Sequence, residues 1–336
     1  MARFVLDTGI LLDQYKITKE LADTVSYSMK TNPIAGKILE EKTSSLFSVH
    51  TISEMNLIKN KKRVVLFAQG WDQKTVKNIL TRKVKKIVVD NERDLNMLLE
   101  NLNSEIDLYL RMRLREKTVH TGKHFVFGMC PEHINKLIPQ LKKDKNIKNL
   151  GIHFHRKTQN ISEWSLKDDL KNALLPETFK SIDMINMGGG LPVKYKNSNP
   201  NINAIMPEIR SFKKWLDSNK IKMVIEPGRF LAAPCIKLEA KIINIYNNNI
   251  ILDCSVFNTA MDTFIANTRL EIQGELDSGT AYSVKGCTPD SMDIFRYRVF
   301  LDNPKIGDSM VFLNAGAYNF HSDFCGLERI ETIVIS

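Results

Sequence analysis

The feature that most constrains the fold is a rhythm of short β-rich runs along the first two thirds of the chain. Eight such runs alternate with stretches in which apolar residues recur at helical spacing. The runs are VSYSMK (25–30), LFSVH (46–50), VVLFA (64–68), KIVVD (86–90), LYLRMR (108–113), LGIHFH (150–155), INMGGG (185–190) and KMVIEPG (222–228). Helix-like segments lie between them, at 72–83, 91–102, 131–143 and 203–219. This alternation predicts an α/β fold with a TIM-like (β/α)8 barrel.

The pattern changes after Pro234, where polar and apolar residues alternate with period two and turn residues separate the segments. The expected strands are 236–246, 248–256, 268–275, 281–286, 297–302, 308–314 and 330–335. This part predicts an all-β domain, a barrel or a sandwich, joined by the N-terminal RFVLD as an added strand. We therefore expect a barrel domain over 8–233 and a β domain over 234–336 plus 1–7.

Composition narrows the class of protein. No apolar run approaches the roughly 18 residues that a membrane span requires, and MARFVLDTGILLDQYK has neither the basic start nor the cleavage site of a signal peptide. Cys130, Cys235, Cys254, Cys287 and Cys325 form no CxxC pair, which favours reduced thiols in a cytoplasmic protein. The net charge of +10 is spread along the chain, so we expect no nucleic-acid or membrane partner.

In a barrel of this kind, functional groups gather at the carboxyl ends of the strands. Lys30 ends the first run, His155 ends the sixth, and Glu226 and Arg229 come at the end of the eighth or just after it. A lysine at the mouth of a barrel is a Schiff-base candidate, because burial lowers the pKa of its ammonium. A lone lysine is more often a surface residue, so this assignment depends on the other motifs.

The GGGLP segment ends the seventh run with Gly188, Gly189 and Gly190. Glycines let backbone N–H groups approach an anion, and barrels often bind phosphate after strands seven and eight. In EPGR, Arg229 could clamp a phosphate and Glu226 could meet a protonated ring nitrogen, although taken alone the motif fits a surface salt bridge equally well. A lysine, an anion cradle and such a carboxylate together describe a pyridoxal phosphate pocket.

His153 and His155 share one face of the sixth run and could suggest a metal site. Such a site would need an HxH on the first strand and further ligands on later strands, which the sequence lacks. We therefore predict no metal. His155 is interpreted as a ring that stacks on a flat cofactor, and His153 as a residue that fills the barrel.

Taken in order, these motifs resemble the fold type III pyridoxal phosphate-dependent decarboxylases, the group of ornithine, arginine and diaminopimelate decarboxylases. The resemblance covers nearly the whole chain and implies pyridoxal 5'-phosphate as cofactor, with Lys30 as the lysine that holds it. The other assigned positions are Glu54 in FSVHTISE, Arg111 in LRMR, His155 and Thr158 in GIHFHRKTQ, Gly188 to Gly190, Glu226, Arg229, and Tyr318 in NAGAYNF. Thr158 and Tyr318 would bind the phosphate.

GCTPDSMD (286–293) resembles the segment that a partner subunit contributes, which implies a homodimer with active sites at the interface. The chain departs from the family here, because Pro289 stands before Asp290 where the family usually has a cysteine. We expect Cys287, two residues earlier, to be the proton donor or another group to replace it. A second departure is Ser48, where the family usually has an aspartate.

The resemblance implies decarboxylation of an amino acid in polyamine or amino acid metabolism. Asp290 and Asp262 could each bind a distal amine or guanidinium, which favours a basic substrate such as ornithine, lysine or arginine. Arg269 could instead meet a distal carboxylate, as in diaminopimelate or a related carboxylated amine. Two alternatives remain open: a racemase or D-amino acid dehydratase of similar fold, and a catalytically altered homologue that lost its proton donor at Pro289.

Overall fold

The computed structural model describes residues 1–114 and 127–336 of the chain. These residues form two compact units. The barrel unit comprises Lys16–Leu191 and Asn201–Gly228, and the β unit comprises Met1–Tyr15, Pro192–Pro200 and Arg229–Ser336. The units meet in the chain after Gly228, a few residues before the expected boundary at 233/234. The difference arises because the short helix α10 (Arg229–Ala232) makes its contacts inside the β unit, where Arg229 pairs with Asp262.

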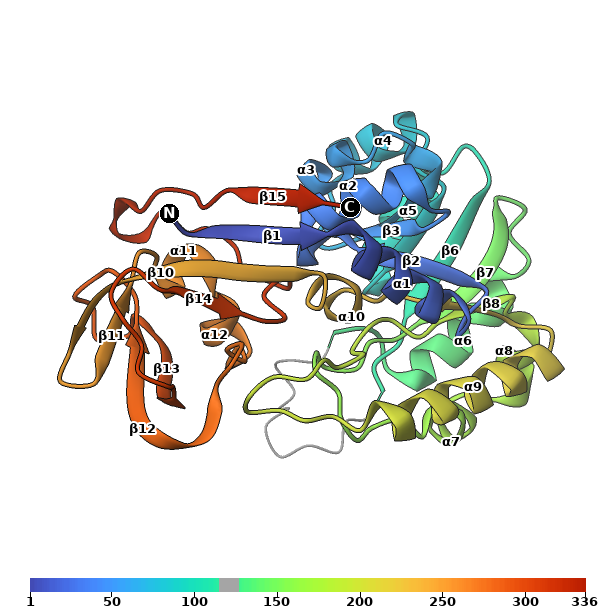
Figure 1. Ribbon diagram of the computed structural model, residues 1–336. Coiled ribbons are helices and arrows are strands. Elements are labelled where there is room, and N and C mark those ends of the chain that lie inside the picture. The colour runs from blue at the N-terminus through green and yellow to red at the C-terminus, as the bar shows by residue number, and fades with distance from the viewer. Residues whose placement is uncertain (115–126) are drawn as a thin grey trace. The chain divides into compact units, whose positions relative to one another are not determined.

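The barrel unit contains a closed ring of eight parallel strands, which confirms the predicted (β/α)8 barrel (Figure 1). The strands are β2 (Thr24–Ser28), β3 (Leu46–Val49), β4 (Val64–Phe67), β5 (Lys86–Val89), β6 (Ile106–Arg111), β7 (Ile147–His153), β8 (Met184–Asn186) and β9 (Lys222–Ile225). Each overlaps one of the eight runs. The ring closes where β9 pairs with β2, through Thr24 with Val224 and Val25 with Ile225.

Apolar side chains fill the inside of the barrel. Val65, Phe67, Val88, Tyr109 and Val224 form one buried cluster from β4, β5, β6 and β9. Branched and aromatic residues pack well on pleated parallel strands, so the barrel is a solid core and not a pore. Functional groups are therefore confined to the two ends of the strands.

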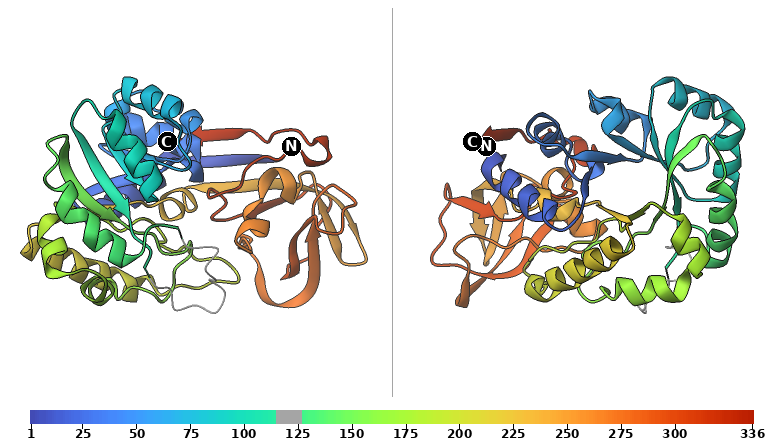
Figure 2. Two further views of the ribbon diagram at one scale, coloured as in Figure 1. Left: turned by 180° about the vertical axis from the view of Figure 1, so that it is seen from behind. Right: turned by 90° about the vertical axis from the view of Figure 1, so that its right-hand side faces the viewer.

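Helices cover the outside of the strand ring (Figure 2). They are α2 (Pro33–Lys42), α3 (Ile52–Leu57), α4 (Gln73–Thr81), α5 (Glu92–Asn101), α6 (Pro131–Leu141), α7 (Leu166–Ala173), α8 (Pro176–Ser181) and α9 (Ile202–Ser218), with 3-10 turns η1 (Met29–Thr31) and η2 (Lys61–Arg63). Another helix, α1 (Thr8–Lys19), precedes β2. Local signals set the helix starts: Asn32 accepts hydrogen bonds from the amides of Ile34 and Ala35, with Pro33 in the first turn.

The β unit is built on a seven-stranded mixed sheet. Its strands are β1 (Arg3–Asp7), β10 (Ile236–Tyr246), β11 (Asn249–Leu252), β12 (Leu276–Lys285), β13 (Ile294–Phe300), β14 (Ser309–Phe312) and β15 (Thr332–Ile335). RFVLD is indeed a strand of this sheet: β1 pairs antiparallel with β10 and parallel with β15, and the three run side by side in Figure 1. Short helical turns also occur, namely α10, α11 (Val256–Thr259), α12 (Asp262–Ile265) and η3 (Phe324–Gly326).

One predicted strand, 268–275, is wrong. This segment is joined to the sheet by a single bridge between Ile272 and Phe312. The backbone of Arg269 instead bonds to the 192–200 segment, because its carbonyl accepts from the Lys196 amide at 2.8 Å and its amide donates to Asn197 at 2.9 Å. In the described parts of the chain, no helix is both long enough and apolar enough to cross a bilayer.

Asp94 ties a loop of the barrel unit to helix α5. Its carboxylate is 1% exposed and accepts hydrogen bonds from the amides of Gly70 and Trp71, both at 2.9 Å, and from the Asn91 side chain at 2.8 Å. The loop between β4 and α4 therefore depends on one buried charge that is fully hydrogen-bonded.

We predict that Asp94→Ala lowers the free energy of unfolding by about 2–3 kcal/mol, since the buried Trp71 amide and the partly buried Gly70 amide both lose their acceptor. Asp72→Ala is the matched control: Asp72 is exposed and only caps α4, through the Thr75 amide at 2.7 Å, so its loss should be much smaller. Urea denaturation followed by circular dichroism measures both. Equal losses would contradict the role of Asp94.

Candidate active site

The structure places the candidate residues of the barrel unit at the carboxyl ends of its strands. Lys30 lies in η1 immediately after β2, Arg111 ends β6, His155 lies two residues beyond β7, Gly188 lies two beyond β8, and Glu226 follows β9. Parallel strands in a closed ring bring these ends to one mouth. These five residues are far apart in sequence, and the fold brings them to one end of the barrel.

Glu226 is a buried carboxylate, 7% exposed, with three hydrogen-bond partners. Its Oε1 accepts from Ser48 Oγ at 2.6 Å and from Asn186 Nδ2 at 2.8 Å, and its Oε2 lies 3.2 Å from His153 Nε2. Burial would raise the pKa of this carboxyl, but the hydrogen bonds from His153, Ser48 and Asn186 outweigh burial and hold the pKa below its ordinary value. Glu226 is therefore an anion.

Sequence reasoning missed Asn186 and the contacts of Ser48 and His153, because they depend on strand register.

Lys30 has a pKa below its ordinary value. The Lys30 side chain is exposed, and the main cause is partial desolvation of the ammonium by the protein around it. The positive charge of Arg111 acts in the same direction, and the carboxylates of Glu226 and Glu54 oppose both. A lowered pKa makes the neutral, nucleophilic amine available nearer to neutral pH. The environment of Lys30 therefore suits attachment to a carbonyl group.

His155 presents a neutral ring at the mouth. Its Nδ1 accepts a hydrogen bond from the Gly189 amide at 3.2 Å, so the ring proton belongs on Nε2. His155 is exposed to solvent, but desolvation by the surrounding protein, together with His153 and Arg111, lowers its pKa to about 3. A neutral, flat imidazole fits the expected stacking role.

The glycine segment is required by packing. A Cβ on Gly188 would lie 2.4 Å from the Phe154 carbonyl oxygen, and one on Gly189 would lie 2.6 Å from that of Glu226. Gly188 also has a φ of +66°, which favours glycine. The Gly188 amide already donates to Asn186 Oδ1 at 3.0 Å, and the Gly189 amide to His155. Two of the three expected anion-binding amides therefore have partners within the barrel unit.

Several charged groups surround the mouth. Arg111 pairs with Asp90 at 3.2 Å, and Asp90 directly follows β5. Glu54 Oε2 accepts from the His50 amide at 2.6 Å, and the His50 ring stacks on Phe67 with centroids 4.8 Å apart. Asp90 and His50 were not predicted, although both follow a strand and could have been found by that position. Thr158 lies exposed in the loop after His155.

Arg229 and Asp262 form a buried ion pair in the β unit. Arg229 is 3% exposed and Asp262 1%, with Nη1–Oδ2 at 2.5 Å and Nη2–Oδ1 at 3.0 Å. Tyr195 bonds to Arg229 at 2.8 Å, Thr268 bonds to Asp262 at 2.8 Å, and the Tyr318 ring lies 5.0 Å from the guanidinium. Because its oxygens already have these partners, Asp262 is not retained as the expected substrate residue; it holds Arg229.

The 286–293 loop of the β unit is organised by Asp293, which sequence reasoning did not single out. This carboxylate is buried and accepts from the amides of Val256 and Thr288 at 2.8 and 3.1 Å and from the Thr288 hydroxyl at 2.7 Å. Cys287 is exposed, and partial burial with the charge of Asp293 raises the pKa of its thiol. Asp290 is half-buried, and its Oδ1 accepts from the Met292 amide at 2.7 Å.

Arg269 is half-buried in the same unit. Its Nη1 donates to the Ile294 carbonyl at 3.1 Å, and its guanidinium stacks on Tyr297 at 4.9 Å. These contacts hold the side chain without neutralising its charge.

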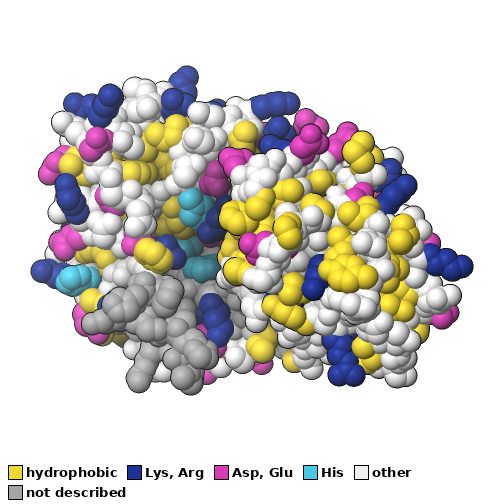
Figure 3. Space-filling model, turned by 90° about the vertical axis from the view of Figure 1, so that its left-hand side faces the viewer, with side chains coloured by type: hydrophobic (Ala, Val, Ile, Leu, Met, Phe, Trp, Pro, Cys, Tyr) yellow, Lys and Arg dark blue, Asp and Glu magenta, His cyan; other side chains and the backbone are white. Residues whose placement is uncertain are grey.

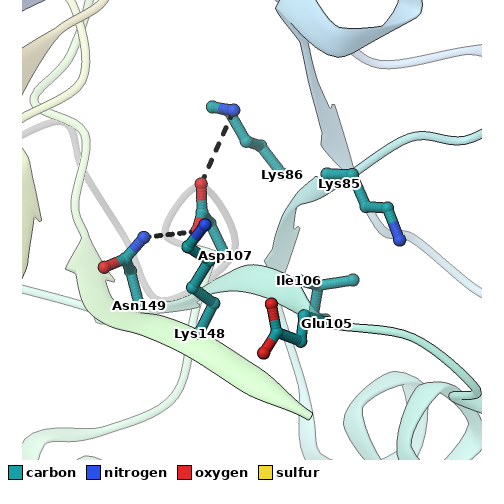
Figure 4. A pocket seen from close by; sticks show the side chains of 7 residues that line it. All are labelled: Lys85, Lys86, Glu105, Ile106, Asp107, Lys148 and Asn149. Carbon is teal, nitrogen blue, oxygen red and sulfur yellow. Dashed lines mark hydrogen bonds and ion pairs between the residues drawn. The ribbon is translucent and has the colours of Figure 1, made fainter.

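A cavity of about 370 Å³ lies at the other end of the barrel strands (Figure 4). Lys85, Lys86, Glu105, Ile106, Asp107, Lys148 and Asn149 line it. Asp107 bonds to Asn149 at 2.6 Å and pairs with Lys86 at 3.5 Å, so its charge is compensated. These residues stand at the amino ends of β5 to β7, which serve stability and not catalysis in such barrels. In the described part of the chain, no cluster of three or more His, Cys, Asp or Glu could hold a metal.

The fold and this mouth define a barrel enzyme of the pyridoxal phosphate class. Residues 45–233 match the family described as pyridoxal-dependent decarboxylase, pyridoxal binding domain. The chain therefore belongs to the pyridoxal-dependent decarboxylases, the fold type III family of amino acid decarboxylases.

Individual relatives agree with this assignment. The chain is 24% identical to the "Probable ornithine decarboxylase" of Dictyostelium discoideum, over 96% of this chain and 76% of that protein. It is 26% identical to the diaminopimelate decarboxylase of Bacteroides thetaiotaomicron, over 57% and 53% of the two chains. A lysine/ornithine decarboxylase of Vibrio vulnificus, solved with cadaverine, has the same fold with a TM-score of 0.81 at 20% identity, covering 100% of this chain and 95% of that one.

Pyridoxal phosphate is the cofactor of this family, and the residues at the mouth fit it. Lys30 offers an amine with a lowered pKa, Glu226 an ionised carboxylate suited to a protonated ring nitrogen, and His155 a flat neutral ring. The close backbone contacts of Gly188 and Gly189 leave no room for side chains in the loop that follows β8.

We predict that borohydride traps pyridoxal phosphate on Lys30, with a pH midpoint below the 10.5 of an ordinary lysine, because the pKa of Lys30 is lowered. Glu226 raises this pKa, so Glu226→Gln should move the midpoint further down; Arg111 lowers it, so Arg111→Gln should move it up. Peptide mapping after trapping at a series of pH values measures the midpoint. Lys30→Arg is the control and should take no label. Label on another lysine would overturn the assignment.

Proposed function

We propose that this protein decarboxylates a basic or diamino acid, such as ornithine, lysine, arginine or a related carboxylated amine. The observation that carries the proposal is the ionised Glu226 carboxylate at the same barrel mouth as Lys30. A carboxylate at this position favours a protonated cofactor ring, which decarboxylation needs as an electron sink. It also argues against a racemase, whose branch of the fold places an arginine near the ring nitrogen.

The residues of this chain have separate tasks in that reaction. When bound, pyridoxal phosphate would supply an electron-withdrawing ring, which is the chemistry that decarboxylation needs. Lys30 provides the neutral amine that holds the cofactor, Glu226 keeps a proton on the ring nitrogen, and His155 supports the flat face of the ring. Thr158 and Tyr318 remain the phosphate residues that the resemblance assigns. Arg229, which the EPGR motif suggested as a phosphate clamp, has its guanidinium paired with Asp262.

The substrate class rests on the β unit. Asp290 is half-buried. Among the described residues, its carboxylate accepts a hydrogen bond only from the Met292 amide of the same loop. It can therefore still bind a distal amine or guanidinium of a substrate. Arg269 favours a second candidate, a substrate with a distal carboxylate such as diaminopimelate. Its guanidinium contacts the Ile294 carbonyl and the Tyr297 ring, and it forms no ion pair with the described residues. Diaminopimelate decarboxylases among the relatives support keeping this candidate.

Cys287 is the proposed donor of the proton to the α-carbon. Decarboxylation leaves an electron pair that must be protonated at the α-carbon to yield the amine. The raised pKa of the Cys287 thiol keeps it in its protonated form at neutral pH, so it can act as an acid. Pro289 has no proton to give.

A homodimer is the proposed active unit. Exposed apolar side chains gather over one face of the β unit (Figure 3). Among the exposed residues of this unit are Ile265 (61%), Met292 (58%) and Tyr297 (64%). Clustered exposed apolar side chains indicate an interaction surface, and 286–293 is the segment expected to serve the partner's site.

The first test is a screen of carbon dioxide release from ornithine, lysine, arginine, diaminopimelate and carboxynorspermidine, with Lys30→Ala as the inactive control. We expect the highest kcat/KM for a substrate with a distal cation, and a higher KM for it in Asp290→Asn but not in Arg269→Gln. Fastest turnover of diaminopimelate, with its KM raised by Arg269→Gln, would establish the second candidate instead. Exchange of the α-proton without carbon dioxide release would reveal a racemase.

The second test addresses the dimer. Mixing inactive Lys30→Ala chains with inactive Asp290→Ala chains should restore part of the activity, because one site of each hybrid dimer keeps both residues. Two Lys30→Ala preparations mixed together provide the control. No recovery, with subunit exchange demonstrated by differently tagged chains, would place each complete site within one chain.

The third test addresses Cys287. In Cys287→Ala the proton should go more often to the cofactor carbon, so the product ratio should shift from amine toward aldehyde and the enzyme should lose activity during turnover. Cys325→Ala, which removes another exposed thiol of the same unit, is the matched control. An unchanged product ratio and lifetime would remove Cys287 from the mechanism.

A further inference from the structure

His153, the last residue of β7, has a role beyond filling the barrel. Its side chain is 1% exposed, and its Nε2 lies 3.2 Å from Glu226 Oε2. The ring of Phe67 meets it edge-on, with centroids 5.0 Å apart and planes at 82°. The imidazole is thus held in one orientation, with one nitrogen directed at the carboxylate.

We propose that His153 is a positioning residue that acts as a neutral hydrogen-bond donor to Glu226, holding the carboxylate in place without neutralising it. The proposal rests on the proposed function, in which Glu226 faces the cofactor's ring nitrogen.

The other ring nitrogen shows which form His153 takes. Among the described residues, His153 Nδ1 is buried and has no hydrogen-bond partner. A proton on Nδ1 would leave a buried donor unsatisfied, which is costly. The proton therefore belongs on Nε2, where it is donated to Glu226, and the ring is neutral.

The charges around His153 are consistent with this form. Glu226 favours the imidazolium, whereas burial, Arg111 and His50 disfavour it. Burial is the largest of these effects, and the pKa of His153 lies below its ordinary value. The buried pair is thus an anionic carboxylate beside a neutral imidazole.

The two oxygens of Glu226 differ in what they can still accept. Oε1 already accepts from Ser48 and Asn186, and the Ser48 hydroxyl is oriented by the hydroxyl of Ser26 at 2.8 Å. Among the residues that the structure describes, Oε2 has only the longer contact with His153 and can accept from a second donor. With His153 neutral, all three partners are uncharged, so the carboxylate keeps its negative charge and Oε2 can offer its share of it to a donor. An imidazolium there would pair with the carboxylate and weaken its hold on a proton at the ring nitrogen.

The test compares three variants. His153→Phe keeps a flat ring of similar size without the donor, His153→Gln restores a neutral donor, and Tyr109→Phe removes another buried polar atom of the barrel interior, one that contacts Met184 Sδ at 3.2 Å. The readouts are the imidazole ¹⁵N resonances of the cofactor-free protein from pH 6 to 8 and the ¹⁵N shift of bound, ring-labelled pyridoxal phosphate. Circular dichroism confirms folding of each variant.

We expect His153 to remain in the Nε2–H form over this pH range and the bound ring nitrogen to be protonated. His153→Phe should move the ring shift toward the unprotonated value and lower kcat by about 10-fold or more, the size of one lost hydrogen bond to a charged group. His153→Gln should restore much of the ring shift and of kcat, and Tyr109→Phe should change neither quantity.

Two results would overturn the inference: a protonated His153 at pH 7, or a His153→Phe protein whose ring shift and kcat match the wild type. If His153→Phe fails to fold, the wild-type resonances and the His153→Gln variant still test whether His153 is a neutral donor to Glu226. A wild-type protein that binds no cofactor would overturn the proposed function, while the imidazole resonances would still show whether His153 is the neutral donor to Glu226.

Discussion

The pairing of β9 with β2 closes the barrel, and the active-site candidates depend on that closure. Residues about two hundred positions apart, Thr24 and Val224, become neighbours in one ladder. The Ser28 amide also donates to the Pro227 carbonyl at 3.2 Å, directly beside the two site residues. Because Lys30 follows the first of these strands and Glu226 follows the second, closure alone puts the amine and the carboxylate at one mouth. No local propensity could do this.

Burying a carboxylate at the mouth has a large desolvation cost, and the surrounding strands compensate it. Ser48 from β3, Asn186 from β8 and His153 from β7 each contribute a hydrogen-bond partner to Glu226. These partners are neutral, so the charge is stabilised and not cancelled. The Arg229–Asp262 pair in the β unit follows a different principle, since there two opposite charges meet with bidentate geometry and lose their net charge. The barrel therefore keeps an available anion, whereas the β unit holds a paired cation.

The departures from sequence-based expectation have specific physical causes. The segment 268–275 alternates like a strand, but in the described part of the chain its backbone pairs with the sheet only at the bridge between Ile272 and Phe312, and the backbone of Arg269 bonds to the 192–200 segment. Asp262 resembles a free acidic residue in sequence, yet a buried guanidinium takes both of its oxygens. His153 resembles a core residue and is one, but its burial directs a nitrogen at Glu226. In each case the deciding partner lies far away along the chain.

The sequence by itself determined the barrel, the N-terminal strand of the β sheet and the positions of Lys30, Gly188 to Gly190 and Glu226 at strand ends. These follow from periodicity and from the rule that parallel strands end at one mouth, both of which are local signals repeated many times. The motifs also sufficed to recognise the family. Only the tertiary structure decided which groups touch: the three partners of Glu226, the tautomers of His153 and His155, and the pairing of Asp262 with Arg229. Hydrogen bonds and burial depend on register and distance between strands, and a single chain read in order carries no measure of either.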